Sequence, residues 1–213
     1  MKCDKKMMPV YAVTDRAWLN GRTLREVVKE ALEGGATCIQ LREKELDGEA
    51  FLQEAISIRS LCSEYRIPFI VNDDVDIAIK SRADGVHIGQ HDMEAAKVRE
   101  LIGPDMILGV SAQAVEQAVR AEHDGADYLG VGAVFSTGTK ADADDVSYDE
   151  LKAICGAVSI PVVAIGGISI DNIRELAGSG IDGVAVVSAI FAAADPRTAT
   201  ADLLKCVKKE LLS

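Results

Sequence analysis

The sequence has few aromatic residues, no cluster of basic residues and no long hydrophobic run. Aromatic side chains make up 4% of the 213 residues while hydrophobic residues make up 48%, so a core must be built from aliphatic side chains. No apolar stretch approaches the roughly 18 residues of a membrane span. The net charge of −11 argues against nucleic acid and against an anionic membrane as partners. These exclusions leave a globular protein with an aliphatic core as the expected class.

Cysteine is also sparse and unpatterned. The five cysteines are widely spaced, and none forms a Cys-x-x-Cys pair. This pattern fits neither a disulfide framework nor a zinc site, so a reducing, cytoplasmic location is the simple expectation. The first ten residues carry charges but no apolar segment, and we therefore expect no secretory signal there.

Short apolar segments recur along the chain and alternate with stretches of helical periodicity. The expected strands are residues 10–14, 37–41, 69–71, 85–88, 107–110, 128–131, 162–165 and 184–187. Thr23 with Glu26, and Ser147 with Glu150, are capping-box patterns that predict helix starts. Eight strands, each followed by a helix, predict one (β/α)8 TIM barrel over residues 1–213, although a doubly wound sheet uses the same unit.

A weak internal repeat favours the barrel. Gly-Ala-Thr37, Ala-Asp84-Gly, Gly-Ala-Asp127 and Ile-Asp182-Gly each precede an expected strand, about two strand–helix units apart. Such an alternation of odd and even units is expected when a barrel is built from pairs of units.

Charged side chains gather where the second expected strand ends. In barrels of this kind the chemistry lies at the C-terminal ends of the strands. Gln40, Arg42 and Lys44 alternate, so an extended chain would point all three one way, and two cations with an amide suit a pyrophosphate. The same residues also fit a solvated strand end with ordinary ion pairs.

Carboxylates follow the next two strands. Asp73 comes directly after Asn72, and Asp92 follows the fourth strand. Neighbouring strand ends would bring the two carboxylates close enough to share Mg²⁺. Both positions also precede helical patterns, where Asp is a common N-cap, so this second interpretation stays open.

Hydroxyl groups and glycines follow the remaining strands. Ser111 ends the fifth strand, where capping is as natural as ligand contact. Gly167, with Val187 and Ser188 after the eighth strand, suits a phosphate held by backbone N–H groups, although paired glycines also form ordinary turns. His87 lies within a strand and is expected to be a satisfied core residue.

Taken together, these segments resemble the thiamine-phosphate synthase family. The resemblance runs in order through residues 11–15, 40–44, 72–73, 84–90 with Asp92, 109–111, 125–128, 137–140, 164–168 and 187–188. It implies a transferase that joins hydroxymethylpyrimidine pyrophosphate to thiazole phosphate, carboxylated or not. Pyrophosphate would leave in a dissociative substitution assisted by Mg²⁺. The partners would be small phosphorylated molecules, and a homo-oligomer stays open.

The resemblance also assigns roles residue by residue. Catalytic roles fall to Arg42, Lys44, Ser111 and Lys140, and Mg²⁺ binding falls to Asp73 and Asp92. The substrate-binding set comprises Gln40, Leu41, Arg42, Glu43, Lys44, Asn72, Ser111, Thr137, Gly138, Thr139, Lys140, Gly167, Val187 and Ser188. Within that set, the loop threonines and the last three residues would hold the thiazole phosphate.

Two positions depart from the family pattern. Ser136 stands where Pro often precedes the first loop threonine, and Gln113 stands where His often follows the strand-5 serine. Related thiazole tautomerases use a His at that second position for proton transfer, which Gln cannot perform, so Gln113 argues against a tautomerase. A non-catalytic barrel that binds a thiamine precursor stays open, because binding would need many of the same contacts.

Overall fold

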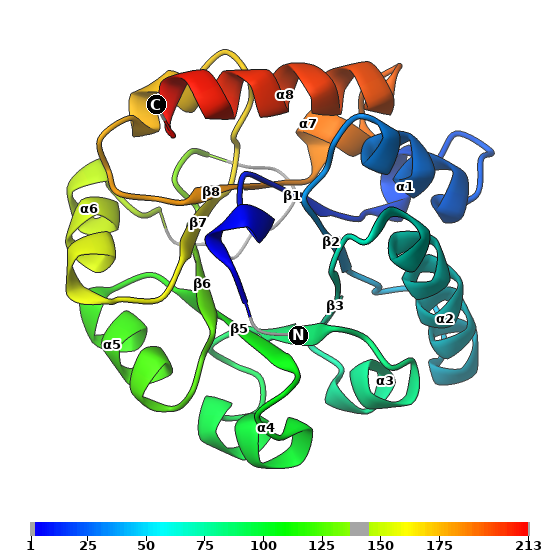
Figure 1. The fold of residues 1–213 in the computed structure, drawn as a ribbon, viewed down its shortest axis with the longest axis horizontal. Helices are drawn as coiled ribbons and strands as arrows, with labels where there is room; N and C mark the ends of the chain where they lie inside the picture. Colours follow the sequence, from blue (N-terminus) through cyan, green and yellow to red (C-terminus); the bar gives the residue numbers. More distant parts are fainter. Residues whose placement is uncertain (1–2, 137–144, 213) are drawn as a thin grey trace.

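Eight parallel strands close into a barrel in chain order, and helices surround it (Figure 1). This computed structural model describes residues 3–136 and 145–212. The strands are β1 Val10–Val13, β2 Cys38–Leu41, β3 Phe69–Asn72, β4 Gly85–Ile88, β5 Ile107–Ala112, β6 Tyr128–Val131, β7 Val162–Ile165 and β8 Gly183–Val186. Because β1 pairs with β8, the sheet is closed. The predicted (β/α)8 barrel is confirmed, and a doubly wound sheet is excluded.

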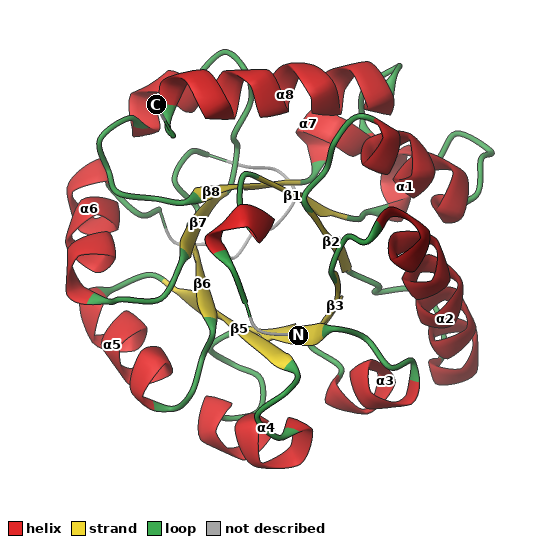
Figure 2. Ribbon diagram, in the orientation of Figure 1, coloured by secondary structure: helices red, strands yellow, loops and turns green. Residues whose placement is uncertain are grey.

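Helices follow the strands around the ring (Figure 2). They are α1 Leu24–Glu33, α2 Gly48–Tyr65, α3 Val75–Lys80, α4 Ala95–Ile102, α5 Val115–His123, α6 Tyr148–Ala157, α7 Ser188–Phe191 and α8 Pro196–Glu210, with 3-10 turns η1 Lys5–Met7, η2 Arg16–Trp18 and η3 Ile173–Leu176. The expectation that a helix follows every strand is wrong after β7, where only η3 forms. Glycines with positive φ, a conformation that an α-helix does not use, flank this turn: Gly166 and Gly167 before it, and Gly178 and Gly180 after it.

The two predicted helix starts differ in their caps. Thr23 and Glu26 form the full capping box of α1, each accepting the other's backbone N–H. At α6, Ser147 accepts from the Glu150 N–H at 3.2 Å, but the Glu150 carboxylate accepts from the Val115 N–H instead. The second capping box is therefore only half formed, because Glu150 ties α6 to the start of α5.

Two apolar layers hold the barrel together. The larger layer lies between strands and helices and includes one face of α2, on which Phe51, Ala55, Ile58 and Cys62 are buried. The smaller layer fills the inside of the barrel; its buried members are Met7, Met8, Tyr11, Val13, Cys38, Ile70, Ile107, Tyr128, Val163 and Ala185. Met7 and Met8 reach this inner layer from the N-terminal segment, which lies across the ring in Figure 1. One end of the barrel is thus plugged by apolar side chains.

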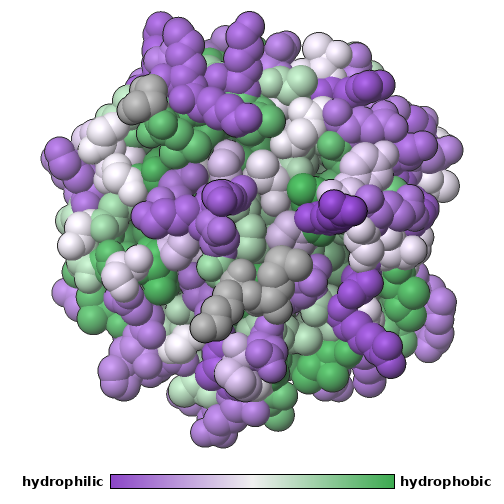
Figure 3. All heavy atoms as spheres, viewed as in Figure 1, coloured by the Kyte–Doolittle hydropathy of each residue, from purple (hydrophilic) through white to green (hydrophobic). Residues whose placement is uncertain are grey.

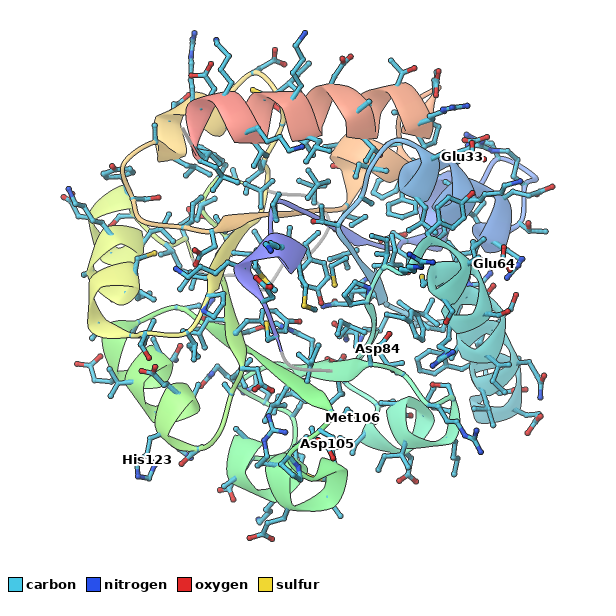
Figure 4. All side chains as sticks on the ribbon, viewed as in Figure 1. Glu33, Glu64, Asp84, Asp105, Met106 and His123 are labelled. Atoms are coloured by element: carbon cyan, nitrogen blue, oxygen red, sulfur yellow. The ribbon has the colours of Figure 1, made fainter. Side chains whose placement is uncertain are left out.

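The internal repeat has a structural explanation at that same N-terminal end. Thr37, Asp84, Asp127 and Asp182 each lie just before an even-numbered strand. The side chain of each accepts a hydrogen bond from a backbone N–H at the start of the preceding strand. The bonds run from Val10 N to Thr37 Oγ1 at 2.9 Å, Phe69 N to Asp84 Oδ2 at 3.0 Å, Leu108 N to Asp127 Oδ2 at 2.8 Å and Val162 N to Asp182 Oδ2 at 3.0 Å. Figure 4 labels Asp84. These side chains satisfy amides that strand pairing leaves without a partner.

The outer surface is predominantly polar on the face in view. Hydrophilic residues form most of its edge, over the helices, in Figure 3. His123 at the end of α5 points outward (Figure 4), with its side chain 86% exposed. Within residues 3–136 and 145–212, no helix combines the length and hydrophobicity needed to cross a bilayer.

Candidate active site

Polar side chains replace apolar ones toward the C-terminal ends of the strands. Along β2, Cys38 faces the barrel interior and Gln40, two residues on, faces the same way. The same alternation brings His87 of β4 and Ser111 of β5 to this level. Gln40 and His87 are buried, whereas Ser111 is partly exposed. The open end of the barrel is therefore lined by hydrogen-bonding groups.

A continuous chain of hydrogen bonds joins these groups through two tyrosines. Gln40 Nε2 donates to Tyr11 Oη at 3.0 Å, and the Tyr11 and Tyr128 hydroxyls lie 2.6 Å apart. Tyr128 Oη lies 2.9 Å from His87 Nδ1, and His87 Nε2 lies 3.0 Å from Ser111 Oγ. Burial raises the pKa of both tyrosines well above its ordinary value. The expectation that His87 is a hydrogen-bonded core residue is confirmed, and one of its partners is the candidate site residue Ser111.

The two cations after β2 pair with neighbours on opposite sides, which the predicted alternation did not anticipate. The strand ends at Leu41, and Lys44 lies in a bend. Arg42 Nη1 lies 3.5 Å from Asp15 Oδ2 beyond β1, whereas Lys44 Nζ lies 2.7 Å from Asp73 Oδ2 beyond β3. The cations therefore reach opposite neighbours and link three successive strand ends.

Glu43 makes the turn that separates these cations. Its Oε1 accepts from the amides of Lys44, Glu45 and Leu46 at 2.8, 2.6 and 3.1 Å, and its Oε2 pairs with Arg16. Burial alone would raise the pKa of Glu43, but the hydrogen bonds from Arg16 and the amides outweigh it, and the pKa is lowered. With its side chain 2% exposed, Glu43 organises the loop from within.

Leu41 lies in the same segment but faces the other way. Its side chain is fully buried in the layer between the strands and the helices. Only the backbone of Leu41 can face a ligand in the barrel mouth. The predicted role of Leu41 in substrate binding is therefore limited to backbone contacts.

Asp73 and Asp92 form the pair that the sequence predicted. Asp73 has a left-handed φ of 64°, which is uncommon outside glycine, and its N–H donates to His87 O at 2.8 Å. Asp92 Oδ2 accepts from the Gly89 N–H at 2.7 Å. Burial raises the pKa of Asp92, and the charge of the neighbouring Asp73 raises it further.

These two carboxylates fit a divalent cation. Their mutual repulsion is a cost that a bound cation would relieve, and Lys44 supplies the positive charge beside them. Among the described residues, no group of three or more His, Cys, Asp or Glu side chains is placed to hold a metal ion. A cation here would take its remaining ligands from water or substrate oxygens, as Mg²⁺ commonly does.

The loops after β7 and β8 carry the residues predicted to bind a phosphate. Gly167 has a φ of 62°, and a Cβ there would lie 2.6 Å from Ser136 O, so its smallness also serves packing against the loop after β6. Val187 precedes the short helix α7, which begins at Ser188. The first N–H groups of any helix lack intrahelical acceptors and can therefore face an anion.

The rest of the candidate site is only partly described. Asn72 is partly exposed at the end of β3, and Gln113 lies one residue past the end of β5. Ser136 is the last described residue before the gap. Four candidates lie outside the described residues: Thr137, Gly138, Thr139 and Lys140.

Several residues of the site carried no individual prediction from the sequence. Thr14 is fully buried and accepts from the Arg42 N–H at 3.0 Å, joining the ends of β1 and β2. Asp15 pairs with Arg42, and Gln90 Nε2 donates to Ser111 O at 2.6 Å. Tyr11 and Tyr128 complete the interior chain. In the sequence these residues are visible only as polar side chains within or next to short apolar strands. Nothing in the sequence shows which of those strands face each other across the barrel.

A closed (β/α)8 barrel whose ionisable side chains gather at the C-terminal strand ends has the organisation of an enzyme that acts on small molecules. The model of the thiamine monophosphate synthase family matches residues 10–190. The chain belongs to this family and is a transferase.

Individual relatives agree with the family. Thiamine-phosphate synthases of Clostridium tetani and Clostridium beijerinckii are 50% and 51% identical to this chain over 194 residues, which is 91% of this chain and 93% of theirs. A solved structure of thiamine phosphate pyrophosphorylase from Pyrococcus furiosus shares 43% identity at a TM-score of 0.90 and covers 97% of this chain and 98% of that chain. These similarities support the thiamine-phosphate synthase function that the resemblance implied.

Proposed function

We propose that the chain joins hydroxymethylpyrimidine pyrophosphate to thiazole phosphate, carboxylated or not, and releases pyrophosphate. The observation that carries the proposal is the row of ionisable groups across four neighbouring strand ends. Asp15 pairs with Arg42, Lys44 pairs with Asp73, and Asp73 lies beside Asp92. Cationic side chains can bind the oxygens of a pyrophosphate, and carboxylates can bind its metal ion. This row of alternating charges therefore suits a pyrophosphate together with its cation.

The proposed chemistry is a dissociative substitution. The bond from the pyrimidine methylene carbon to the pyrophosphate oxygen breaks, and its electron pair leaves with pyrophosphate. The thiazole nitrogen then donates its lone pair to the carbon. With the thiazole that carries no carboxylate, no proton moves in either step, which agrees with a site whose buried tyrosines keep their protons. The protein's task is to stabilise the charge that develops on the leaving group.

The leaving-group side would comprise Arg42, Lys44 and Lys140, the last of these carried over from the resemblance alone. Arg42 offers planar, paired donors and Lys44 a compact charge, both already drawn to the rim by carboxylates. When bound, Mg²⁺ at Asp73 and Asp92 would neutralise part of the pyrophosphate charge.

The remaining candidates divide between the two substrates. Gln40, Asn72 and Ser111 would contact the pyrimidine substrate, with Leu41 adding only backbone contacts and Glu43 holding the loop in shape. Gly167, Val187 and Ser188 would hold the thiazole phosphate with Thr137, Gly138 and Thr139. We further propose a cytoplasmic location, which the five unpaired cysteines support.

The deciding experiment incubates the purified protein with both substrates and Mg²⁺ and follows thiamine phosphate by chromatography. The expected result is product that requires both substrates and the metal. Rearrangement of the thiazole without coupling would instead identify a tautomerase, and tight binding without turnover would identify a precursor-binding barrel. Lys140→Ala should lower the turnover number, and an unaffected rate would remove its leaving-group role.

A further inference from the structure

The interior hydrogen-bond chain links two residues to which the proposed function gives substrate contacts. Gln40 belongs to β2 and Ser111 to β5, three strands apart around the barrel. Tyr11, Tyr128 and His87 lie between them, and the two tyrosines are each 1% exposed. We propose that Tyr11, Tyr128 and His87 are positioning residues that fix, as one unit, the hydrogen-bond polarity that Gln40 and Ser111 present to the substrates. This inference rests on the proposed function for the roles of its two ends.

The direction of the chain follows from counting protons. Gln40 Nε2 donates to Tyr11 Oη, and in the proposed arrangement the Tyr11 proton points to Tyr128, 2.6 Å away, and not to the neighbouring Cys38. The Tyr128 proton then points to His87 Nδ1, which leaves the neutral imidazole with its proton on Nε2. That proton is donated to Ser111 Oγ, so the serine keeps its own proton to donate to a ligand.

The chain can reverse only as a whole. A separation of 2.6 Å between the Tyr11 and Tyr128 oxygens requires one proton between them, since two protons or none would repel. Burial raises the pKa of both phenols, so neither loses its proton to relax this requirement. If Gln40 instead accepted from Tyr11, every donor would turn round and Ser111 would donate to His87. The two ends are therefore coupled, although neither touches the other.

The barrel is built to leave room for this chain. A Cβ on Gly109 of β5 would lie 2.3 Å from Tyr128 Oη and 2.5 Å from His87 Nδ1. A Cβ on Gly130 of β6 would lie 3.1 Å from His87 Cε1. Two adjacent strands thus have glycine where the imidazole and phenol meet. The atom nearest to the Gly109 Cβ would be Tyr128 Cζ at 2.2 Å, so these glycines make room for the aromatic rings as well as for the hydroxyl.

The test reads the tautomer of His87 directly by ¹⁵N NMR of histidine-labelled protein. Spectra are recorded without substrates at about pH 8, where a histidine of ordinary pKa is neutral. His91 and His123 are exposed and serve as internal references, and His87→Asn assigns the remaining signal. The expected result is a proton on Nε2 of His87. Gln40→Glu, whose carboxylate can only accept, should move that proton to Nδ1 at the far end of the chain.

A second variant separates coupling from a merely structural role. Tyr128→Phe keeps the ring but breaks the chain, so adding Gln40→Glu to it should no longer move the His87 proton. Tyr128→Phe alone should lower kcat/KM for the pyrimidine substrate by about tenfold, the equivalent of one lost hydrogen bond, while the KM for thiazole phosphate stays unchanged. Thermal unfolding of each variant verifies that it folds.

Either of two results overturns the proposal: a wild-type His87 protonated on Nδ1, or a tautomer that does not respond to Gln40→Glu in the folded protein. If that carboxylate variant does not fold, the wild-type tautomer and the Tyr128→Phe kinetics still decide. Because the tautomer is measured without substrates, its failure is distinct from failure of the proposed function. A responsive tautomer in a protein that makes no thiamine phosphate would refute the function alone.

Discussion

A single methyl group added at Gly109 tests how closely the inside of the barrel is built around His87 and Tyr128. In Gly109→Ala the new Cβ would lie 2.2 Å from Tyr128 Cζ and 2.5 Å from His87 Nδ1. Ordinary contacts between such atoms are about 3.5–4.0 Å, so the phenol or the imidazole must move by more than about 1 Å. Both rings are buried and hydrogen-bonded to each other at 2.9 Å, so this movement breaks their bond.

The cost has two parts. Overpacking a well-filled interior costs about 1–3 kcal/mol. Leaving a buried hydroxyl or ring nitrogen without its partner costs about 1–3 kcal/mol more. We therefore expect Gly109→Ala to lower the free energy of unfolding by about 2–6 kcal/mol, a large share of the roughly 5–15 kcal/mol typical of a folded protein.

The assay is urea unfolding followed by circular dichroism, with Gly156→Ala as the matched control. Gly156 lies exposed in α6, and a Cβ there meets nothing within 4 Å. The control should be neutral or more stable by up to about 1 kcal/mol, because alanine favours a helix over glycine. A Gly109→Ala protein within about 0.5 kcal/mol of wild type would refute the argument that this glycine makes room for the interior chain.

Three further outcomes are expected. Asp73→Asn should weaken activity in a way that added Mg²⁺ partly restores; a titration of activity with Mg²⁺ checks this, and an unchanged metal dependence would contradict the assignment. Glu43→Gln should lower the free energy of unfolding by about 1–3 kcal/mol at neutral pH. Because the pKa of Glu43 is lowered on folding, its stabilisation is present above the unfolded pKa and is lost as the pH falls through the folded one. The free energies of unfolding of wild type and Glu43→Gln, measured with urea, should therefore converge in acid. A difference that does not depend on pH would contradict the role given to the Glu43 charge. Asp84→Ala should cost about 1–3 kcal/mol by leaving the buried Phe69 amide without its acceptor, whereas Asp76→Ala, in an exposed pair, should change stability by less than about 0.5 kcal/mol. Equal losses of stability for Asp84→Ala and Asp76→Ala in thermal unfolding would contradict the capping of the Phe69 amide by Asp84.

Periodicity was sufficient to predict the barrel, because parallel strands buried on both faces appear as short aliphatic runs. It also predicted the Asp73 and Asp92 pair, since neighbouring strand ends lie side by side in any such barrel. Alternation along a strand did not predict that Arg42 and Lys44 pair with opposite neighbours. There the strand ends at Leu41, and Glu43 in the following loop also contacts Arg16, 27 positions earlier, which no local pattern shows.

The interior hydrogen-bond chain could not be predicted from the sequence, for a similar reason. Tyr11 and Tyr128 are 117 positions apart and lie on strands that do not pair, so no local pattern connects them. Gly109 was the clearest available signal, because a glycine inside an aliphatic strand often marks close approach by another group. The sequence alone could not say that this group is His87 with Tyr128.

The four side-chain caps at the N-terminal end divide the ring into quarters. Each cap joins an even-numbered strand to the odd-numbered strand before it, so the caps group β1 with β2, β3 with β4, β5 with β6 and β7 with β8. A circular permutant that begins at β3, β5 or β7 keeps every capping residue in the same unit as its amide. One that begins at an even-numbered strand would split a quarter between its two new termini.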